Sequence, residues 1–313
     1  MSQTLNHERK TIWTIGGGKG GSGKSFITVN IGICLSKLGA RVILIDADLG
    51  GANLHTFLGI SRPTLSLSDF IKKRVSNLHE VLVPTNISNL QLLTGAQDLF
   101  NAADLNSIQR QKILRSIRNL EGDYLLVDLG AGNSASVLDF FLMSEGGILI
   151  VTPEPTSVEN TFRFLRTAFY RKLRQSVTSR SVKMLIDSAM DFRNEMGIQN
   201  PYDLIDAVKG LDQEAAEMLM KEIEAFQPNL ILNQVWTKQD VEIGFSIRSA
   251  CKKYFGIHLH YLGYIVYDQE VSHSIRRRNP LVLENSHAQS KASQCIKEIA
   301  TRLAQRHQMS FRF

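Results

Sequence analysis

A glycine-rich segment that carries two lysines lies near the beginning of the sequence. It starts at Gly18, reads Gly-Lys-Gly-Gly-Ser-Gly-Lys-Ser and matches the phosphate-loop pattern G-x-x-x-x-G-K-[ST]. Glycines at these positions allow backbone N–H groups to turn toward the phosphates of a nucleotide, next to the positive N-terminus of a helix. Lys24 would place its charge on the β- and γ-phosphates, and the hydroxyl of Ser25 could bind Mg²⁺. Lys19 needs a further explanation, because a loop that holds its own nucleotide requires only Lys24.

The elements on either side of this segment place it where a phosphate loop belongs. Residues 11–15 form a short apolar run that predicts a buried strand, and residues 26–38 have apolar side chains at helical spacing. The order of strand, loop and helix predicts a nucleotide site. We expect the nucleotide-binding residues to include Gly18, Lys19, Gly20, Gly21, Ser22, Gly23, Lys24, Ser25 and Phe26.

Three aspartates follow aliphatic runs that read as further buried strands. Asp46 and Asp48 end one run, and Asp128 ends another. Asp48 could orient or deprotonate a water molecule for attack on the γ-phosphate, and Asp46 could support Mg²⁺ or the loop. Asp128 would hold a Mg²⁺-bound water. The sequence therefore predicts a metal site made by Ser25, Asp48 and Asp128.

Two glycine-containing turns and one asparagine complete the candidate site. Residues 49–53 and 130–132 follow the acidic positions, and their glycines would let the backbone respond to loss of the γ-phosphate. Gly132 is the residue of the second turn that we expect to approach the nucleotide. Asn233 ends a later apolar run, where its amide could donate to and accept from an adenine edge. The alternative for Asn233 is an ordinary turn asparagine.

The apolar runs are short and continuous rather than alternating, which is typical of parallel strands covered on both faces. We therefore predict a doubly wound α/β fold of the P-loop NTPase type, with a mostly parallel sheet and helices on both faces. The expected strands cover residues 11–15, 41–45, 90–93, 124–127, 148–151, 230–232 and 261–266. The expected helices between them include residues 105–120, 157–174 and 240–254.

One P-loop domain is expected over residues 1–313, because strand and helix signals alternate without a linker. Its core would comprise residues 10–186 and 227–306. Residues 187–226 have helical patterns without a strand and predict an acidic helical insertion. Residues 307–313 would form a short tail.

Composition and cysteine usage favour a cytoplasmic protein. The chain has 313 residues, 43% of them hydrophobic, and no apolar run approaches the roughly 18 residues of a membrane span. The first residues are polar and lack the apolar core of a signal peptide. Cys34, Cys251 and Cys295 are isolated from one another and form neither a Cys-x-x-Cys pair nor a disulfide framework. We expect them to be buried thiols in a reducing compartment.

The net charge of +6 is unevenly distributed. Residues 160–186 carry seven basic and no acidic side chains, whereas residues 187–224 carry ten acidic and three basic ones. Residues 276–278 are three consecutive arginines. A basic surface could contact nucleic acid or anionic lipid. The alternative is a set of solvated helix faces that neutralise one another.

Taken together, these segments resemble the MinD/ParA family of deviant Walker A ATPases. Residues 19–25 resemble the family's box K-G-G-x-G-K-[ST], residues 46–54 its switch I, and residues 123–132 its Walker B and switch II. Residues 152–157 and 262–268 are similar to later family segments. The Asp-Leu-Gly-x-x-Asn-Leu and Asp-x-Gly-Ala-Gly sequences are most similar to the MinD and FlhG (FleN) branch. The resemblance covers most of the chain from Lys10 to Leu303, apart from the acidic insertion.

The resemblance implies an ATPase that uses ATP and Mg²⁺, acts as an ATP-dependent homodimer and is stimulated by a partner protein. In the family, the lysine at position 19 crosses to the nucleotide of the partner subunit, which would explain Lys19. Asp48 would be the catalytic aspartate, acting with Lys19 and Lys24. Asn233 would recognise adenine. The implied function is spatial regulation of a division site, a flagellar apparatus or another polar structure, with an unidentified activator or cargo.

Some residues depart from the family pattern. Val266 stands where relatives commonly have proline near the base. Ile296, Ile299 and Leu303 predict a final helix packed on the body, rather than the amphipathic membrane helix of MinD relatives. The segment after it, which contains Met309, is short for a membrane anchor. Peripheral association with the inner face of the cell membrane therefore stays an alternative to a purely cytoplasmic location.

Other functions on the same fold make different demands on the sequence. A ParA-type partition ATPase would bind DNA nonspecifically through the basic stretch at residues 163–183, and this is the principal alternative function. Iron–sulfur carriers of the superfamily need cysteines near switch II, but the chain has none between Cys34 and Cys251. An amide-forming ligase should carry a substrate domain with its own catalytic groups, which the sequence does not indicate.

Overall fold

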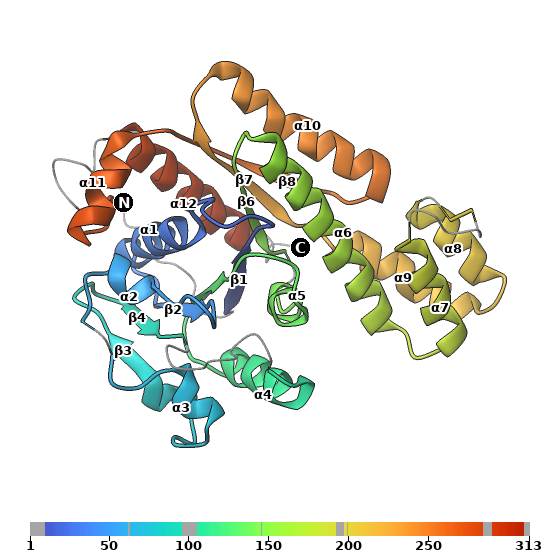
Figure 1. The fold of residues 1–313 in the computed structure, drawn as a ribbon, viewed down its shortest axis with the longest axis horizontal. Helices are drawn as coiled ribbons and strands as arrows, with labels where there is room; N and C mark the ends of the chain where they lie inside the picture. The colour runs from blue at the N-terminus through green and yellow to red at the C-terminus, as the bar shows by residue number, and fades with distance from the viewer. Residues whose placement is uncertain are drawn as a thin grey trace.

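The computed structural model describes residues 10–61, 63–95, 105–144, 146–191, 197–198, 200–283 and 290–309, with side chains up to residue 305. Its centre is an eight-stranded sheet in the order β3-β4-β2-β5-β1-β6-β7-β8 (Figure 1). The strands are β1 (Thr11–Gly16), β2 (Val42–Ala47), β3 (Leu82–Pro84), β4 (Leu90–Leu93), β5 (Tyr124–Leu129), β6 (Ile148–Val151), β7 (Asn229–Val235) and β8 (His260–Val266). Only β3 pairs antiparallel, with β4, and all other neighbours in the described sheet are parallel.

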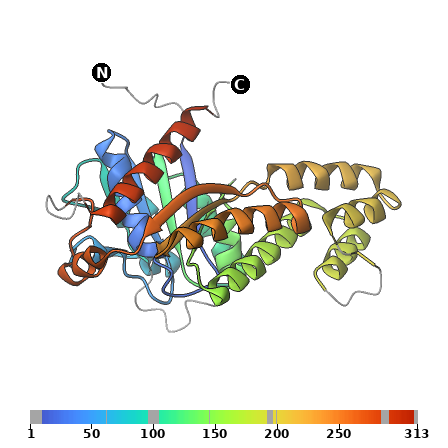
Figure 2. The same ribbon diagram turned by 90° about the horizontal axis from the view of Figure 1, so that it is seen from above.

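Helices cover both faces of this sheet (Figures 1 and 2). Those of the first half are α1 (Lys24–Lys37), α2 (Leu54–Phe57), α3 (Leu67–Ile71), the 3₁₀ helix η1 (Leu78–Val81), α4 (Ser107–Arg118) and α5 (Ala135–Phe141). Those of the second half are α6 (Pro155–Ser176), α7 (Arg180–Ala189), α8 (Pro201–Lys209), α9 (Gln213–Ala225), α10 (Lys238–Phe255), α11 (Gln269–Arg277) and α12 (Lys291–Met309).

The continuous apolar strands are explained by burial on both sides. Along β2, Ile43 and Ile45 belong to the core that also contains residues of α4, α5 and α6. Val42 and Leu44 belong to a second core with residues of α1 and α12. Alternate side chains of one strand therefore enter two different cores, as expected for a covered parallel sheet. The predicted fold class, a mostly parallel α/β sheet with helices on both faces, is confirmed.

The strand order also creates a topological switch point at the carboxyl ends of the central strands. Strand β1 lies between β5 and β6, so the chain moves to opposite sides of β1 in its two halves. In open α/β sheets, ligands bind at such a switch point. The loops after β1, β2 and β5 meet there.

The helical insertion is larger than the sequence predicted. We expected it to begin at residue 187, where the charge becomes acidic, but a separate helix, α7, already begins at Arg180. Ser179 ends the preceding loop and accepts a hydrogen bond from the N–H of Val182 as the N-cap of α7. Charge is a property of the helix surface, so its change of sign does not mark the point at which a helix starts. Helices α7, α8 and α9 extend from the sheet beside α6 (Figures 1 and 2).

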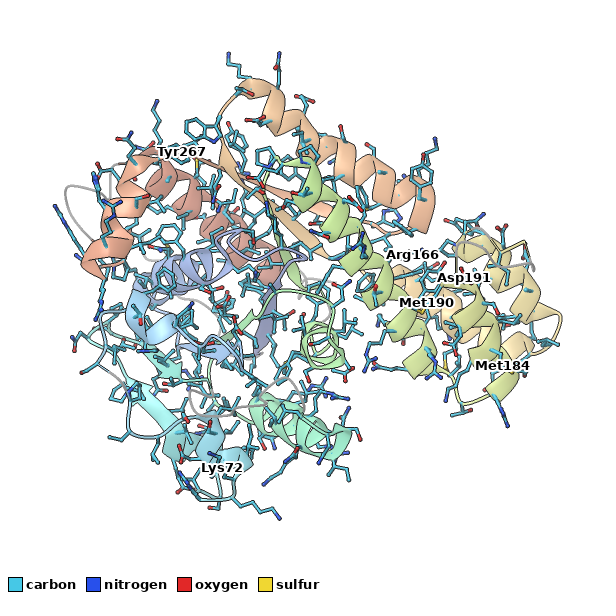
Figure 3. All side chains as sticks on the ribbon, in the orientation of Figure 1. Lys72, Arg166, Met184, Met190, Asp191 and Tyr267 are labelled. Carbon is cyan, nitrogen blue, oxygen red and sulfur yellow. The ribbon has the colours of Figure 1, made fainter. Side chains whose placement is uncertain are left out.

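Contacts with α6 hold the insertion in place. Arg166 of α6 donates a hydrogen bond to the carbonyl of Ala189 at 3.2 Å. Figure 3 shows Arg166 in the same region as Met190 and Asp191, and the charge of Asp191 acts on Arg166. Lys172 of α6 forms an ion pair with Glu222 of α9. The insertion also has an apolar interior that is continuous with the core beneath α6, to which Leu204, Val208 and Leu219 contribute.

The final helix packs on the body as predicted. Ile296, Ile299 and Leu303 are all buried, and they lie in the core shared with α1. The helix reaches Met309, three residues beyond the predicted end of the core. The other residues of the predicted tail, and the segment before Lys10, lie outside the described residues.

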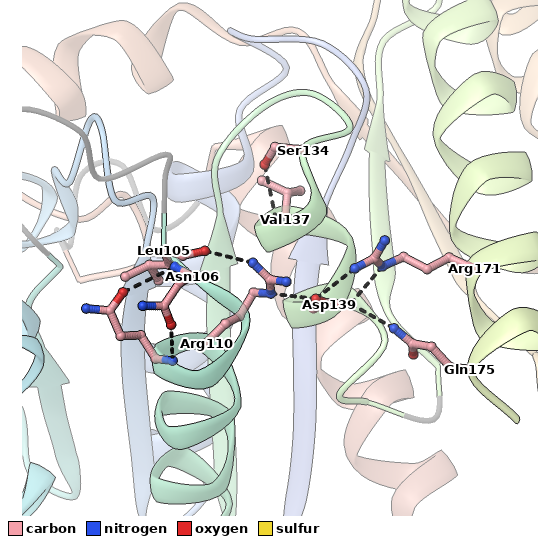
Figure 4. A network of polar contacts seen from close by, with 9 residues as sticks. Leu105, Asn106, Arg110, Ser134, Val137, Asp139, Arg171 and Gln175 are labelled. Atoms are coloured by element: carbon pink, nitrogen blue, oxygen red, sulfur yellow. Dashed lines mark hydrogen bonds and ion pairs between the residues drawn. The ribbon is translucent and has the colours of Figure 1, made fainter. Parts of the chain in front are cut away.

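A buried carboxylate joins three helices on the other face of the sheet (Figure 4). Asp139 of α5 accepts hydrogen bonds from Arg110 of α4 at 2.6 Å and from Arg171 of α6 at 2.7 and 2.9 Å. Gln175 donates a further one at 2.9 Å. Burial acts most strongly on its pKa and in the upward direction, but these donors together lower the pKa of Asp139 below its ordinary value. The network fixes α5, which follows the candidate switch II, against α4 and α6.

Candidate nucleotide site

The glycine-rich segment connects β1 to α1 as a compact loop. A Cβ atom on Gly18 would lie 2.3 Å from the carbonyl oxygen of Asn160, so no larger residue fits there. Gly23 is the N-cap of α1 and has a φ of 93°, a left-handed conformation that favours glycine. These two glycines allow the loop to turn tightly and end directly at the helix N-terminus, where backbone N–H groups attract anions.

Lys24 lies inside this loop. Its side chain is largely buried, and its Nζ donates to the carbonyl oxygen of Lys19 at 3.1 Å. Burial lowers the pKa of Lys24, while the nearby carboxylates of Asp128 and Asp48 act to raise it. The ammonium group is thus held at the loop, in reach of two of the three predicted acidic residues.

Asp128 is buried at the carboxyl end of β5. The hydroxyl of Thr28 hydrogen bonds to its Oδ1 at 3.2 Å, while Oδ2 has no hydrogen-bond partner among the described residues. Burial, reinforced by the charge of Asp46, raises the pKa of Asp128 to about 8, although a hydrogen bond with Ser25 and the charge of Lys24 act to lower it. An unpartnered buried carboxyl oxygen is costly unless a ligand or water satisfies it.

Asp46 lies opposite Asp128 on the neighbouring strand β2. It is fully buried and accepts hydrogen bonds from the N–H groups of Asn53 at 2.8 Å and Leu54 at 3.0 Å. The N–H of Asp48 donates to it at 3.2 Å. Burial raises the pKa of Asp46 to about 7, against the lowering effect of these donors. Since both oxygens are engaged by the following loop, this geometry favours support of the loop over binding of Mg²⁺.

Asp48 brings the two glycine-containing turns together. A Cβ atom on Gly130 would lie 3.0 Å from Oδ1 of Asp48, and one on Gly51 would lie 3.3 Å from Oδ2. The candidate switch I and switch II segments are therefore in contact through this carboxylate. Gly132 has a φ of 93°, and a Cβ atom there would meet no described atom within 4 Å, so this side of its backbone is open.

Lys19 points in a different direction from Lys24. Its Nζ forms an ion pair with Glu154, which precedes α6, and lies 3.5 Å from the hydroxyl of Thr156. The side chains of Lys19 and Glu154 are 38% and 54% exposed, so the pair lies at the rim of the site. The two lysines of the loop thus have separate environments, one inside the loop and one at its surface.

Asn233 contacts the phosphate loop itself. Its Nδ2 donates to the carbonyl oxygen of Ser22 at 2.8 Å, and the residue is buried at the carboxyl end of β7. A Cβ atom on Gly23 would come within 2.4 Å of the same Nδ2. The sequence did not suggest this tie between β7 and the loop. Recognition of adenine by Asn233 stays a prediction.

Sequence reasoning also missed Glu154, Thr28 and Asn160. Glu154 lies in the segment that resembles the family, but only the fold brings it to Lys19. Thr28 follows Lys24 by four residues, and helical spacing could have identified it as a neighbour on the same face. Asn160 acts through its backbone carbonyl, which has no signal in the side-chain pattern.

The predicted basic surface is partly neutralised within the chain, because four of its seven basic side chains form ion pairs with described residues. Of the seven basic residues between positions 163 and 183, five bond to described groups: Arg163 to Glu159, Arg166 to Ala189, Arg171 to Asp139, Lys172 to Glu222 and Arg174 to Asp187. Such pairing reduces the positive potential available to a phosphate backbone.

A comparison with protein families identifies the group to which these features belong. The model of the ParA family, described as NUBPL iron-transfer P-loop NTPase, matches residues 8–180, more than half of the sequence. The chain belongs to the ParA family of P-loop NTPases.

Within this ParA-family protein, Cys34 and Cys251 are buried, and burial raises the pKa of their thiols to about 11 and about 12. None of the described helices is long and apolar enough to span a membrane.

Known proteins similar to this ParA-family chain include an antiactivator and a septum site-determining protein. The antiactivator FleN of Pseudomonas aeruginosa is 33% identical over 170 residues, which are 53% of the chain and 59% of FleN. The septum site-determining protein MinD of Synechocystis is 31% identical over 155 residues, 49% of the chain and 58% of MinD. The aligned region thus spans less than two thirds of either relative.

The fold extends beyond the aligned region. The solved structure of MinD from Pyrococcus horikoshii, complexed with Mg-ADP, superposes with a TM-score of 0.65 at 20% identity and covers 97% of this chain and 100% of that one. At this identity the likeness shows the fold alone.

Proposed function

We propose that the protein is an ATP-binding and ATP-hydrolysing switch that forms an ATP-dependent homodimer and regulates the placement of a cellular structure. The observation that carries this proposal is the separation of the two loop lysines. Lys24 is inside the loop and accounts for binding of the protein's own nucleotide. Lys19 is at the rim, where a second subunit can approach. A cation delivered across an interface can neutralise charge that develops during phosphoryl transfer.

The residues around the loop suit ATP with Mg²⁺. Backbone N–H groups of residues 18–25 would bind the phosphates, as expected for a helix N-terminus behind a glycine-rich turn. The hydroxyl of Ser25, with Asp48 and Asp128, would hold the metal or its water ligands, and Oδ2 of Asp128 has the free acceptor that this requires. Bound Mg²⁺ would neutralise charge on the β- and γ-phosphates. Few protein ligands are needed, because Mg²⁺ is usually held by one or two carboxylates together with phosphates.

Asp48 would orient or deprotonate the attacking water. It suits this role because it is partly buried, lies beside Gly130 of the candidate switch II and acts electrostatically on Lys24. Its contacts with the turns after both β2 and β5 would couple hydrolysis to a change in their conformation. Asn233 would then contribute to binding of adenine while it ties β7 to the loop.

Placement of a division site, a flagellar apparatus or another polar structure is the process that we propose for this switch. Of the named relatives, FleN is an antiactivator and MinD is a septum site-determining protein. An unidentified protein would act as activator or cargo and would stimulate a weak intrinsic ATPase. The location would be cytoplasmic, with peripheral association at the inner face of the membrane as a second state.

The proposal is tested by measuring mass and phosphate release on the same sample. With ATP and Mg²⁺ the wild-type protein should form a dimer in light scattering, and with ADP it should be a monomer. Asp48→Ala should retain the ATP dimer and lose at least about a hundredfold in phosphate release, the usual contribution of a general base. Wild-type phosphate release by this variant would remove Asp48 from the catalytic role, and a monomer in all nucleotide states would overturn the switch.

The alternative of a DNA-partition ATPase has a separate test. It needs a basic surface, but the stretch at residues 163–183 is mostly paired with groups of the same chain. A shift of duplex DNA that requires ATP and weakens steeply with salt would favour the alternative. Absence of any shift at low salt would remove it.

A further inference from the structure

A second concave site lies far from the phosphate loop, at the edge of the sheet. A cleft of about 790 Å³ is bounded by α10, by the segment that leads into β8 and by α12. Basic side chains dominate its polar lining, and no aspartate or glutamate is among the described residues that line it. The basic and imidazole groups are Arg248, Lys252, His258, His260 and Arg302.

The cleft is separate from the candidate nucleotide site. Strands β1, β6, β7 and β8 are parallel, and the phosphate loop follows the carboxyl end of β1. The cleft is lined by residues 257–262, which lie at the amino end of β8. The nucleotide site and the cleft therefore lie at opposite ends of the parallel strands.

Arg302 is fixed in this cleft by an irregularity of β8. The pairing of β7 with β8 shifts between Tyr261 and Gly263, which leaves Leu262 as the extra residue of a bulge. The carbonyl of Leu262 accepts a hydrogen bond from Nη1 of Arg302 at 2.7 Å. Gly263 has a φ of 143°, and a Cβ atom there would lie 3.0 Å from Nη1. The bulge in β8 and the glycine after it thus leave room for the guanidinium of Arg302 beside the strand.

The guanidinium of Arg302 has N–H donors that can still bind a ligand. Its one ion pair among the described residues is with Glu298 at 3.7 Å, between side chains that are 54% and 70% exposed. An exposed pair of this length contributes little. Most N–H donors of the planar guanidinium remain available for an anion with several oxygens.

Helix α10 adds two further cations on one face. Arg248 and Lys252 are four residues apart, so their side chains are neighbours, and like charges at this spacing destabilise a helix. Neither forms an ion pair with another described residue. The guanidinium of Arg248 lies over the ring of Phe245, 5.2 Å from its centroid, which orients it beside the cleft.

We propose that this cleft binds the phosphoryl group of a phosphomonoester. Arginine forks match the oxygens of phosphate, and a doubly charged anion would relieve repulsion among Arg248, Lys252 and Arg302. The concave shape suits a single phosphoryl group and its substituent better than an extended nucleic-acid backbone. Such a group can come from a free phosphorylated compound or from a lipid headgroup, and both sources present the same chemistry.

The first experiment uses soluble and lipid probes on the full chain saturated with Mg-ADP. Binding of inorganic phosphate and of pyrophosphate is followed by NMR shifts of the α10 and β8 amides. Vesicles of phosphatidylcholine with phosphatidic acid are compared with phosphatidylcholine alone by co-sedimentation. Binding of phosphate without vesicle binding assigns a soluble ligand, and binding of both assigns a headgroup.

Substitutions on α10 test whether phosphate binds in the cleft. Arg248→Gln with Lys252→Gln should weaken phosphate binding by about tenfold or more, the effect of losing strong charge-assisted contacts. Lys253→Gln is the matched control, because Lys253 is on the same helix but its Nζ lies over the ring of Tyr254 instead of the cleft. It should change binding less than about twofold. Affinity for ADP should be unchanged in all of them, so this result is independent of the proposed switch.

Three results would overturn the proposal. One is an equal loss of affinity in the control variant, and another is the absence of amide shifts at α10 and β8 with either soluble probe. The third is binding of duplex DNA that depends on Arg248 and Lys252 and excludes phosphate, which would assign the cleft to nucleic acid. Circular dichroism melts of each variant exclude unfolding as the cause.

Discussion

Two buried carboxyl groups, Asp128 and Asp139, lie close together in sequence but have opposite environments. Asp139 on α5 is surrounded by Arg110, Arg171 and Gln175, which engage both of its oxygens. Asp128 at the end of β5 has one oxygen without a described partner and shares its surroundings with Asp46. The pKa is lowered for Asp139 and raised to about 8 for Asp128.

The difference separates a carboxylate whose charge is compensated by the chain from one whose charge is not. A buried charge is tolerated where partners of opposite sign and hydrogen bonds compensate for lost hydration, as at Asp139. At Asp128 the chain supplies too little compensation, and strongly perturbed groups at the ligand-binding end of such a sheet are candidates for function. Asp139 also lies in the helix that follows the candidate switch II, so the stable network borders the region that must change.

Removal of the compensated carboxylate should have the largest effect on stability. Asp139→Ala leaves two arginines without their buried partner and should lower the free energy of unfolding by about 3 kcal/mol. Urea denaturation of the nucleotide-free protein measures this. Asp128→Asn is the control, because it removes a carboxyl group whose charged form the folded state disfavours, and it should cost much less. Equal losses for the two variants would break the comparison.

The pH dependence of stability should have opposite signs at the two residues. For Asp128 the folded state holds the proton more tightly than the unfolded state, whose value is near 3.8, so its contribution to stability is full below that value and is lost as the pH rises toward 8. Stability should therefore fall between about pH 5 and pH 8. The pKa of Asp46 is also raised, so it titrates in the same direction and the slope belongs to the pair. Asp128→Asn should flatten this slope in unfolding measured with EDTA present.

Asp139 provides the opposite slope at lower pH. Its lowered pKa means that the unfolded state binds the proton more tightly, so its contribution is present above about pH 4 and is lost as the pH falls below it. Acid unfolding of Asp139→Asn should therefore show less loss of stability in that range than the wild type shows. A wild-type slope in both Asn variants would contradict the assigned environments.

An exposed ion pair should have the smallest effect. Arg163 and Glu159 are one turn apart on α6, with side chains that are 64% and 69% exposed. Arg163→Ala should change the free energy of unfolding by less than about 0.5 kcal/mol, in contrast to the buried network at Asp139. Thermal and urea unfolding of the variant check this, and a loss comparable to that of Asp139→Ala would show that burial is not the deciding factor.

The sequence predicts those strands well that are buried on both faces, because such strands have a continuous apolar pattern. Seven of the strands appeared as such runs. Helix α1 was predicted by helical spacing, and the loop in front of it by its glycines and lysines. Strand β3 was missed because Leu82–Pro84 is short, ends in proline and lies at the antiparallel edge. Helix α7 was assigned to the core because the insertion was recognised by charge rather than by its capping residue, Ser179.

The candidate site was predictable in its residue types and only partly in its contacts. Glycine spacing and strand-terminal aspartates identify Lys24, Asp48 and Asp128 from local pattern. The ion pair of Lys19 with Glu154 and the bond from Asn233 to Ser22 join residues more than a hundred positions apart. Such contacts depend on how helices and strands pack, and no local pattern encodes them.

The central claim is that Lys19 completes the nucleotide site of a second subunit. Light scattering of wild type and Lys19→Ala, each with ATP and Mg²⁺, tests it most directly. Lys19→Ala should still bind nucleotide, because Lys24 and the loop backbone are intact, but it should remain a monomer and lose turnover. An ATP-dependent dimer of normal mass and stability from Lys19→Ala would contradict the claim.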